Sequence, residues 1–249
     1  MAQVPNTYTH RHPSRHIVRL AMSLFAAAFL LLTVGTLQVS AQTTYTLSVP
    51  NSAVSGYPAP YGTAVVTLNT STTATVVFTT NLSGAHAYLM AGVSAADVNV
   101  NATTFSISNI TGSNSLSATF TPGAFSSGGS GNVDGFGTLN QTVNDFDGFT
   151  HSATTISFTL TNTSGTWANS GNVLVANNDG ALAAIHLFVC NNAAATCTAS
   201  SGAIATGFAA NGGATSVPEP VSMLLFGSGL VAIGAKLRRR NSRNLVAAA

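Results

Sequence analysis

The chain has 249 residues, only 6% of which are charged, and a formal net charge of +2. Every lysine and arginine lies before residue 20 or after residue 235, so the segment 42–216 carries five aspartates and no strong base. This segment is long enough for one domain with a buried core. It is a poor partner for nucleic acid, because phosphate binding needs lysine and arginine.

The first 41 residues have the pattern of a secretory signal peptide. Three arginines precede the apolar stretch 20–34, which is short for a membrane span and typical of a signal core. Small residues at 39–41 are those that a signal peptidase reads, so we expect cleavage between Ala41 and Gln42. An uncleaved N-terminal anchor is the alternative.

Residues 42–208 are predicted to form an all-β exported domain. β-branched residues recur in short alternating runs, separated by turn residues, and the charged helix formers are absent. Roughly eight to eleven strands at this spacing predict an antiparallel β-sandwich of the jelly-roll or immunoglobulin-like type. The clearest runs are, in chain order, 44–49, 63–68, 73–78, 104–108, 155–160, 172–175 and 182–189.

Two stretches of small residues are predicted to be irregular. Residues 125–137 are rich in glycine and serine, which favours a long loop or a boundary between two halves. Residues 209–216 are predicted to be a flexible stalk that follows the domain.

The only two cysteines, Cys190 and Cys197, are expected to form a disulfide. An even cysteine count in an exported chain favours pairing, here across a hairpin loop. Two free thiols are the alternative. A metal site fits less well, because no histidine or third cysteine lies nearby at ligand spacing.

Candidate catalytic residues are sparse, and we expect no enzyme. Known catalytic motifs are absent, and the domain contains no glutamate. Asp145 and Asp147, just before Gly148, are candidate Ca²⁺ ligands, with an acidic turn as the alternative. A hydrolase would require His151 or His186 to meet an aspartate and a hydroxyl. His186 lies in an apolar run, which is more typical of a core or interface position.

Aromatic and threonine-rich positions offer two possible binding surfaces. Trp167 and the tyrosines could stack on a sugar ring, although a lone tryptophan in a sandwich is more often part of the core. The threonine-rich runs 70–75 and 161–166 could present hydroxyls to sugar or ice, or be ordinary exposed positions.

The C-terminal segment combines an acidic motif, an apolar run and a basic stop. An apolar helix over 221–237 would be about 25 Å long, enough for a thin bilayer core. The positive-inside rule would leave the basic tail in the cytoplasm and the domain outside. The motif residues are Val217, Pro218, Glu219 and Pro220, and the basic stop is Lys236, Arg238, Arg239 and Arg240.

Together with the export signal, residues 217–243 resemble the PEP-CTERM sorting signal of Gram-negative bacteria. The resemblance implies an exosortase substrate that is exported, held transiently in the inner membrane by its C-terminal helix, and processed near Pro-Glu-Pro. It would then reach the cell surface or the extracellular space. Such proteins are associated with exopolysaccharide and biofilm, and the same tail occurs on proteins labelled ice-binding.

We therefore expect a non-enzymatic structural or adhesive protein of the extracellular polysaccharide matrix. Its expected partners are signal peptidase, an exosortase-like membrane protease, polysaccharide and the membrane, and it needs no cofactor unless Ca²⁺ binds. The alternative is a carbohydrate-binding or ice-binding surface module. An exposed Trp167 would favour the carbohydrate-binding alternative.

Overall fold

A computed structural model describes residues 42–83, 85–191 and 197–217, with side chains described up to residue 211. Within these residues, no helix has the length and apolarity needed to cross a membrane. Several predicted features lie outside the described residues: the signal peptide 1–41 with Ala41, the motif residues Pro218, Glu219 and Pro220, the helix 221–237, and the basic residues Lys236, Arg238, Arg239 and Arg240.

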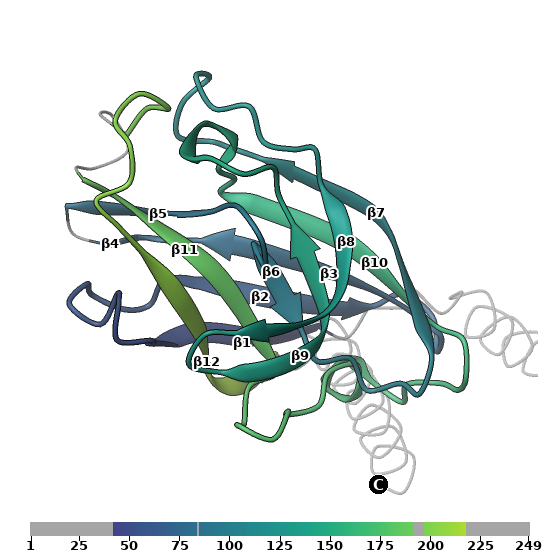
Figure 1. Ribbon diagram of the computed structural model, residues 1–249. Helices are drawn as coiled ribbons and strands as arrows, with labels where there is room; N and C mark the ends of the chain where they lie inside the picture. Colours follow the sequence, from purple (N-terminus) through teal and green to yellow (C-terminus); the bar gives the residue numbers. More distant parts are fainter. Residues whose placement is uncertain (1–41, 84, 192–196, 218–249) are drawn as a thin grey trace, which may run out of the picture. The chain divides into compact units, whose positions relative to one another are not determined.

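The described residues form one antiparallel sheet of 12 strands (Figure 1). Its hydrogen-bonded order is β7-β10-β3-β2-β1-β12-β11-β6-β9-β8, and β5 pairs with both β11 and β4. The strands are β1 (Gln42–Pro50), β2 (Gly62–Leu68), β3 (Thr73–Thr80), β4 (Leu82–Ser83), β5 (His86–Met90), β6 (Ala96–Val98), β7 (Phe105–Ser113), β8 (Ser126–Val133), β9 (Gly137–Asn144), β10 (Thr155–Asn162), β11 (Ala183–Asn191) and β12 (Ala205–Val217). Two short 3-10 turns, η1 (Phe149–His151) and η2 (Ser170–Asn172), complete the elements.

Alternating side chains explain why the longest runs form strands. In β10, Ile156, Phe158 and Leu160 are buried, while the threonines and serine between them are only half-buried. Successive strand residues point to opposite faces, so one face of β10 lies in the core. β2 and β3 show the same alternation.

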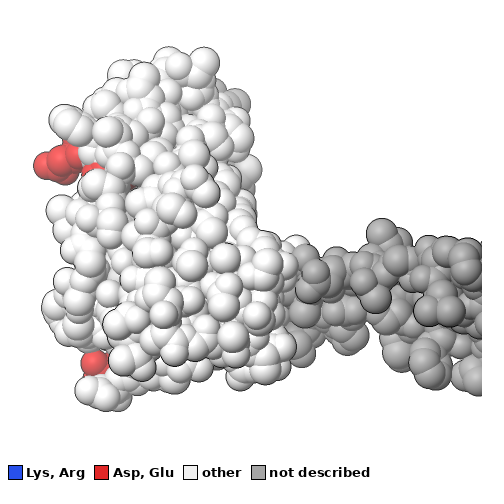
Figure 2. Space-filling view, turned by 90° about the vertical axis from the view of Figure 1, so that its right-hand side faces the viewer, with Lys and Arg blue, Asp and Glu red and all other residues white. Residues whose placement is uncertain are grey.

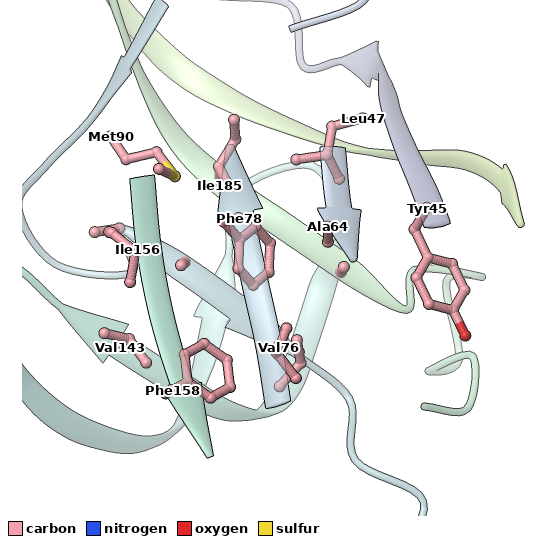
Figure 3. Close-up of a cluster of buried hydrophobic side chains, with 14 of the residues drawn as sticks. Tyr45, Leu47, Ala64, Val76, Phe78, Met90, Val143, Ile156, Phe158 and Ile185 are labelled. Atoms are coloured by element: carbon pink, nitrogen blue, oxygen red, sulfur yellow. The ribbon is translucent and has the colours of Figure 1, made fainter. Parts of the chain in front are cut away.

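The sheet curls around a single main core. Val143 of β9 belongs to the same buried cluster as Phe78 of β3, Phe158 of β10 and Ile185 of β11, although β9 and β10 are far apart in the sheet order (Figure 3). The all-β antiparallel prediction is confirmed. Instead of the two separate sheets of a sandwich, hydrogen bonding runs through one sheet that is nearly closed into a barrel. The register between β1 and β12 shifts at two places, and irregularities of this kind bend a strand locally.

The structure corrects two predictions of irregular structure. Residues 125–137 include β8 and the start of β9, not a long loop. Glycine allows this close pairing, because a Cβ at Gly128 or Gly131 would lie 2.3 or 2.8 Å from a Thr142 side-chain atom. The predicted stalk 209–216 belongs to β12 and pairs with β1. Its composition suggests flexibility, but a partner strand satisfies its backbone.

One predicted strand is also wrong. Residues 172–175 do not form a strand: η2 ends at Asn172, and Leu174 makes only an isolated bridge with Val100.

The predicted disulfide is confirmed. Cys190, near the end of β11, is bonded to Cys197, with 5.9 Å between their Cα atoms. Both cysteines are buried and pack with Leu89 and Phe120 in a small apolar cluster. The bridge therefore joins the end of β11 to Cys197 within this small cluster.

Replacing both cysteines by alanine is expected to lower the free energy of unfolding by about 2–3 kcal/mol. The two cysteines are only seven residues apart, so the closed loop is short and the loss lies at the low end for disulfides. Urea unfolding of the variant beside the wild-type protein measures the loss. The wild-type protein in reductant is the matched control, and unchanged unfolding midpoints in both would contradict the prediction.

Candidate functional site

Two polar pockets lie on either side of a paired backbone segment at one end of the sheet. Val100 forms an isolated bridge with Leu174. Next to it, the Asn99 side chain donates to the carbonyl of Val175 at 2.9 Å, and the Val175 N–H donates to the Asn99 carbonyl at 3.0 Å. Val100 and Val175 line the first pocket, whereas Asn99 and Ala176 line the second. The two pockets therefore share this segment as a wall.

The pockets have similar size and composition. Their volumes are about 430 Å³ and about 480 Å³. The first is lined by Val100, Asn101, Ala102, Thr103, Asn162, Ser164, Gly165, Thr166 and Val175. The second is lined by Asn99, Asn132, Gly137, Thr138, Ala176, Asn177, Asn178 and Asp179. Amides, hydroxyls and backbone groups thus dominate both linings, and Asp179 is the only ionisable residue in them.

The surface around the pockets is also poor in charge. All lysines and arginines of the chain lie outside the described residues. The face drawn in Figure 2 is almost entirely white, with small red areas and no blue. A ligand of this domain therefore meets neutral hydrogen-bonding groups and a few carboxylates.

Trp167 supports the wall of the first pocket. Its indole Nε1–H donates to the Asn101 carbonyl at 2.8 Å, and the ring is only 3% exposed. The Asn101 N–H donates to the Val173 carbonyl, and the Asn101 side chain donates to the Asn172 carbonyl at 3.0 Å. Trp167 is thus a core residue that holds Asn101 in place, and it offers no face for a sugar to stack on.

Asn177 supports the second pocket. Its Nδ2 donates to the carbonyls of Phe136 and Thr138, and its Oδ1 accepts from the N–H groups of Asp179 and Ala181, at distances of 2.7–3.1 Å. The Asn177 amide is therefore saturated, because a side-chain amide offers two donors and two acceptor lone pairs. The saturated amide fixes the shape of this pocket.

The exposed residues of both linings leave groups available for a ligand. Thr103 and Thr166 in the first pocket, and Asn132, Thr138 and Asn178 in the second, are exposed. Their side chains make no hydrogen bond to other parts of the chain that the structure describes. A rigid support with free amides and hydroxyls is suited to a molecule rich in hydroxyl groups.

The tyrosines do not replace Trp167 as a stacking surface. Tyr45, Tyr61 and Tyr88 are at most 1% exposed. Tyr57 is half-buried, with its ring against His86 at 5.1 Å. The predicted aromatic sugar-binding face is therefore not formed by these residues.

The two candidate Ca²⁺ ligands have different environments. Asp145 is buried, and its Oδ1 accepts from the N–H groups of Gly123 and Phe146 at 2.8 and 2.7 Å. Burial raises the pKa of Asp145 to about 6. Asp147 is exposed. Asp145 thus serves as an acceptor in a turn. In the described ranges, no group of three or more histidine, cysteine, aspartate or glutamate side chains is placed to hold a metal ion. Calcium binding stays a prediction.

Neither candidate histidine lines a pocket described above. The Nδ1 of His186 lies 3.1 Å from the Val93 carbonyl, and its Nε2 lies 2.9 Å from the Thr206 hydroxyl. Burial lowers the pKa of His186. The Nδ1 of His151 lies 2.7 Å from the Thr121 carbonyl. The Nδ1 of each ring therefore faces a backbone carbonyl. Asp147 lies close enough to His186, and Asp145 to His151, for their charges to interact, but the described residues show no hydrogen bond between these histidines and aspartates.

The threonine run 70–75 covers the turn between β2 and β3 and the start of β3, and some of its residues are hydrogen-bonded to one another. The hydroxyls of Thr70 and Thr73 lie 2.7 Å apart, and Thr70 also accepts from the Thr73 N–H. In the run 161–166, the hydroxyl of Thr163 bonds to that of Thr104 at 2.8 Å. Thr166 is a lining residue of the first pocket.

Sequence reasoning missed both pockets. The available signal was the spacing of asparagines at the turns, where Asn99 and Asn101 are separated by one residue and Asn177 and Asn178 are adjacent. Asparagine is common in turns for purely local reasons, so this signal does not separate a binding site from a turn.

Comparison with known proteins identifies the C-terminal segment. Residues 216–240 match the family model described as the PEP-CTERM protein-sorting motif. The chain carries a PEP-CTERM sorting signal. This PEP-CTERM motif implies an exported protein that an exosortase processes at the cell surface. Its first two residues, Ser216 and Val217, belong to β12. No curated protein and no solved structure matches the chain.

Proposed function

We propose that this PEP-CTERM protein is a non-catalytic structural or adhesive component of the extracellular polysaccharide matrix of a biofilm, and that its two pockets bind neutral polysaccharide. The observation that carries this proposal is the pair of adjacent, nearly uncharged pockets. They lie on either side of the two backbone segments that the bridge between Val100 and Leu174 joins. Two neighbouring pockets fit a chain of linked units better than a single small molecule.

The chemistry of the pockets favours a neutral glycan over an anionic one. Sugar hydroxyls both donate and accept hydrogen bonds, as do the free amides of Asn132 and Asn178. An anionic chain would lack a cationic partner among the described residues and would meet the carboxylate of Asp179. Like charges at short distance repel one another, most strongly where water is excluded.

Two other observations bear on the alternatives, which are catalysis and ice binding. Asp179 is the only carboxylate in either lining, so the pair of carboxylates that glycoside hydrolysis usually requires is not found in these linings. The hydroxyls of Thr70 and Thr73 bond to each other in a turn, which gives less support to ice binding through that run.

The proposed route to the matrix follows the two ends of the chain. Signal peptidase removes residues 1–41, and the helix 221–237 anchors the protein in the membrane for a time. Exosortase then processes the chain near Pro218–Pro220, and the domain passes to the cell surface or the extracellular matrix. The PEP-CTERM motif supports the exosortase step.

The double substitution Asn132→Ala and Asn178→Ala is expected to weaken binding to a neutral glucan hexasaccharide at least about tenfold. Each substitution removes an amide worth about 1 kcal/mol in hydrogen bonds, and 1.4 kcal/mol is a factor of ten. Titration calorimetry with cellohexaose, laminarihexaose and maltohexaose measures the change. A uronic acid hexasaccharide is the anionic comparison, with no binding expected.

The matched control is Asn191→Ala, which removes an exposed asparagine at the opposite end of β11 from Ala183. It should leave binding unchanged. The proposal fails if the wild-type protein binds none of the three neutral hexasaccharides, or if the pocket variant and Asn191→Ala bind equally well.

A further inference from the structure

The two ends of the described domain are hydrogen-bonded neighbours. β1 and β12 lie side by side (Figure 1). Gln42, the first residue of β1, pairs with Val217, the last residue of β12. The register continues inwards through Thr43 with Ser216, Thr44 with Thr215 and Tyr45 with Ala214. The PEP-CTERM motif begins at Ser216, so the motif starts inside the paired part of the sheet.

β1 is a firmly held partner for the end of β12. On its other side it pairs with β2, where Gln42 faces Thr67. Tyr45 is 1% exposed and Thr43 is 4% exposed. The Thr43 hydroxyl also lies 2.8 Å from that of Ser170 in η2. The end of β12 is therefore docked on a strand that is itself locked into the core.

No spacer separates this pairing from Pro218. Enzymes that take up a peptide in extended form commonly hold it through backbone hydrogen bonds, as an added strand. Residues 214–217 already pair with β1. The folded domain and the processing enzyme therefore compete for the same short stretch of backbone.

We infer that the pairing of β1 with the end of β12 gates exosortase processing, so that the enzyme acts on the state in which residues 214–217 have separated from β1. Strand ends open at a lower free energy than the whole domain. When opening is fast, processing follows the population of the open state. The folded domain thus sets the rate at which its own tail is removed, whatever the pockets bind.

The test locks the pair with a disulfide between two opposite residues, Thr44→Cys and Thr215→Cys. Opposite residues of an antiparallel pair have Cβ atoms within reach of a disulfide. In pulse-chase labelling of cells that contain the exosortase, the oxidised double variant should be processed at least about tenfold more slowly than the wild-type protein. Reductant should restore the rate.

Three controls accompany the locked variant. Each single cysteine variant should be processed normally. The pair Thr63→Cys and Thr79→Cys locks β2 to β3, away from the motif, and should also be processed normally. The wild-type protein in reductant accounts for reduction of the native disulfide between Cys190 and Cys197.

A second variant keeps the inference testable if the new cysteines fail to oxidise. Eight Gly and Ser residues inserted between Val217 and Pro218 separate the motif from the sheet. This variant should be processed several times faster than the wild-type protein, and it should abolish the effect of the lock. Normal processing of the oxidised locked variant, or an unchanged rate with the inserted linker, would overturn the inference.

Discussion

Replacing Asp97 by asparagine is expected to stabilise the protein at neutral pH. Asp97 lies in β6, is completely buried, and has no hydrogen-bond partner for either carboxyl oxygen among the described residues. Desolvation by burial raises the pKa of Asp97 well above its usual value, although the nearby Ser94 acts in the opposite direction. An unpaired buried carboxyl costs several kcal/mol, so we expect a gain on the order of 2 kcal/mol.

The gain should grow with pH. The folded state keeps a proton on Asp97 that the unfolded state releases above the ordinary value of 3.8. The pH-dependent part of the cost of this carboxyl is therefore absent at low pH and grows as pH rises from about 4 towards its folded pKa. Asp145, with its pKa raised to about 6, acts in the same direction between about pH 4 and pH 6. That contribution is common to the wild-type protein and the Asp97→Asn variant.

Urea unfolding at pH 4, 5.5, 7 and 8.5 measures this difference. The variant and the wild-type protein should unfold at similar urea concentrations at pH 4 and diverge above it. Asp145→Asn is the matched comparison, because its gain should level off above about pH 6. If the stability gain of Asp97→Asn is constant across this pH range, or absent at pH 7, burial does not raise the pKa of Asp97.

Replacing Trp167 by alanine is expected to remove about 3–5 kcal/mol of stability and to weaken the proposed glycan binding. The side chain is 3% exposed and belongs to the main core, so its loss leaves a large cavity. Its Nε1–H also holds the Asn101 carbonyl in the wall of the first pocket. We therefore expect the free energy of unfolding to fall and the wall of the first pocket to shift in the same variant.

Trp167→Phe separates these two effects. Phenylalanine keeps most of the buried ring but cannot donate to Asn101, so we expect a stability loss of about 1–2 kcal/mol. Thermal unfolding gives the stability change, and calorimetry with the neutral hexasaccharides gives the affinity change. If Trp167→Phe binds as tightly as the wild-type protein, the hydrogen bond to Asn101 does not shape the pocket.

Local pattern was enough to predict the strands that alternate between buried and half-buried residues. β2, β3 and β10 were predicted because each carries β-branched residues and alternates in sequence, with one face buried in the core. β8 and β12 were not predicted, because glycine, serine and alanine have weak strand preference. Their pairing depends on the partner strands β9 and β1, which lie elsewhere in the chain.

The candidate site was less predictable than the fold. The sequence marks Trp167 as notable, but burial decides whether a tryptophan is a binding surface or a core residue, and burial depends on the whole sheet. The pockets arise where residues 99–103 meet residues 162–179, and residues 132–138 complete the second pocket, so segments far apart in the chain form each lining. The disulfide was predictable because the chain contains only two cysteines and both lie close together in sequence.

The pairing of the first strand with the last also fixes when folding can finish. β1 is the first part of the domain to be synthesised and β12 the last, yet they are neighbours in the middle of the sheet order. Contacts between distant parts of a chain form late and slowly. Until residue 217 has been made, β1 lacks one of its two partners and the sheet stays in two incomplete parts. The protein is thereby kept from completing its fold before the whole domain has been synthesised.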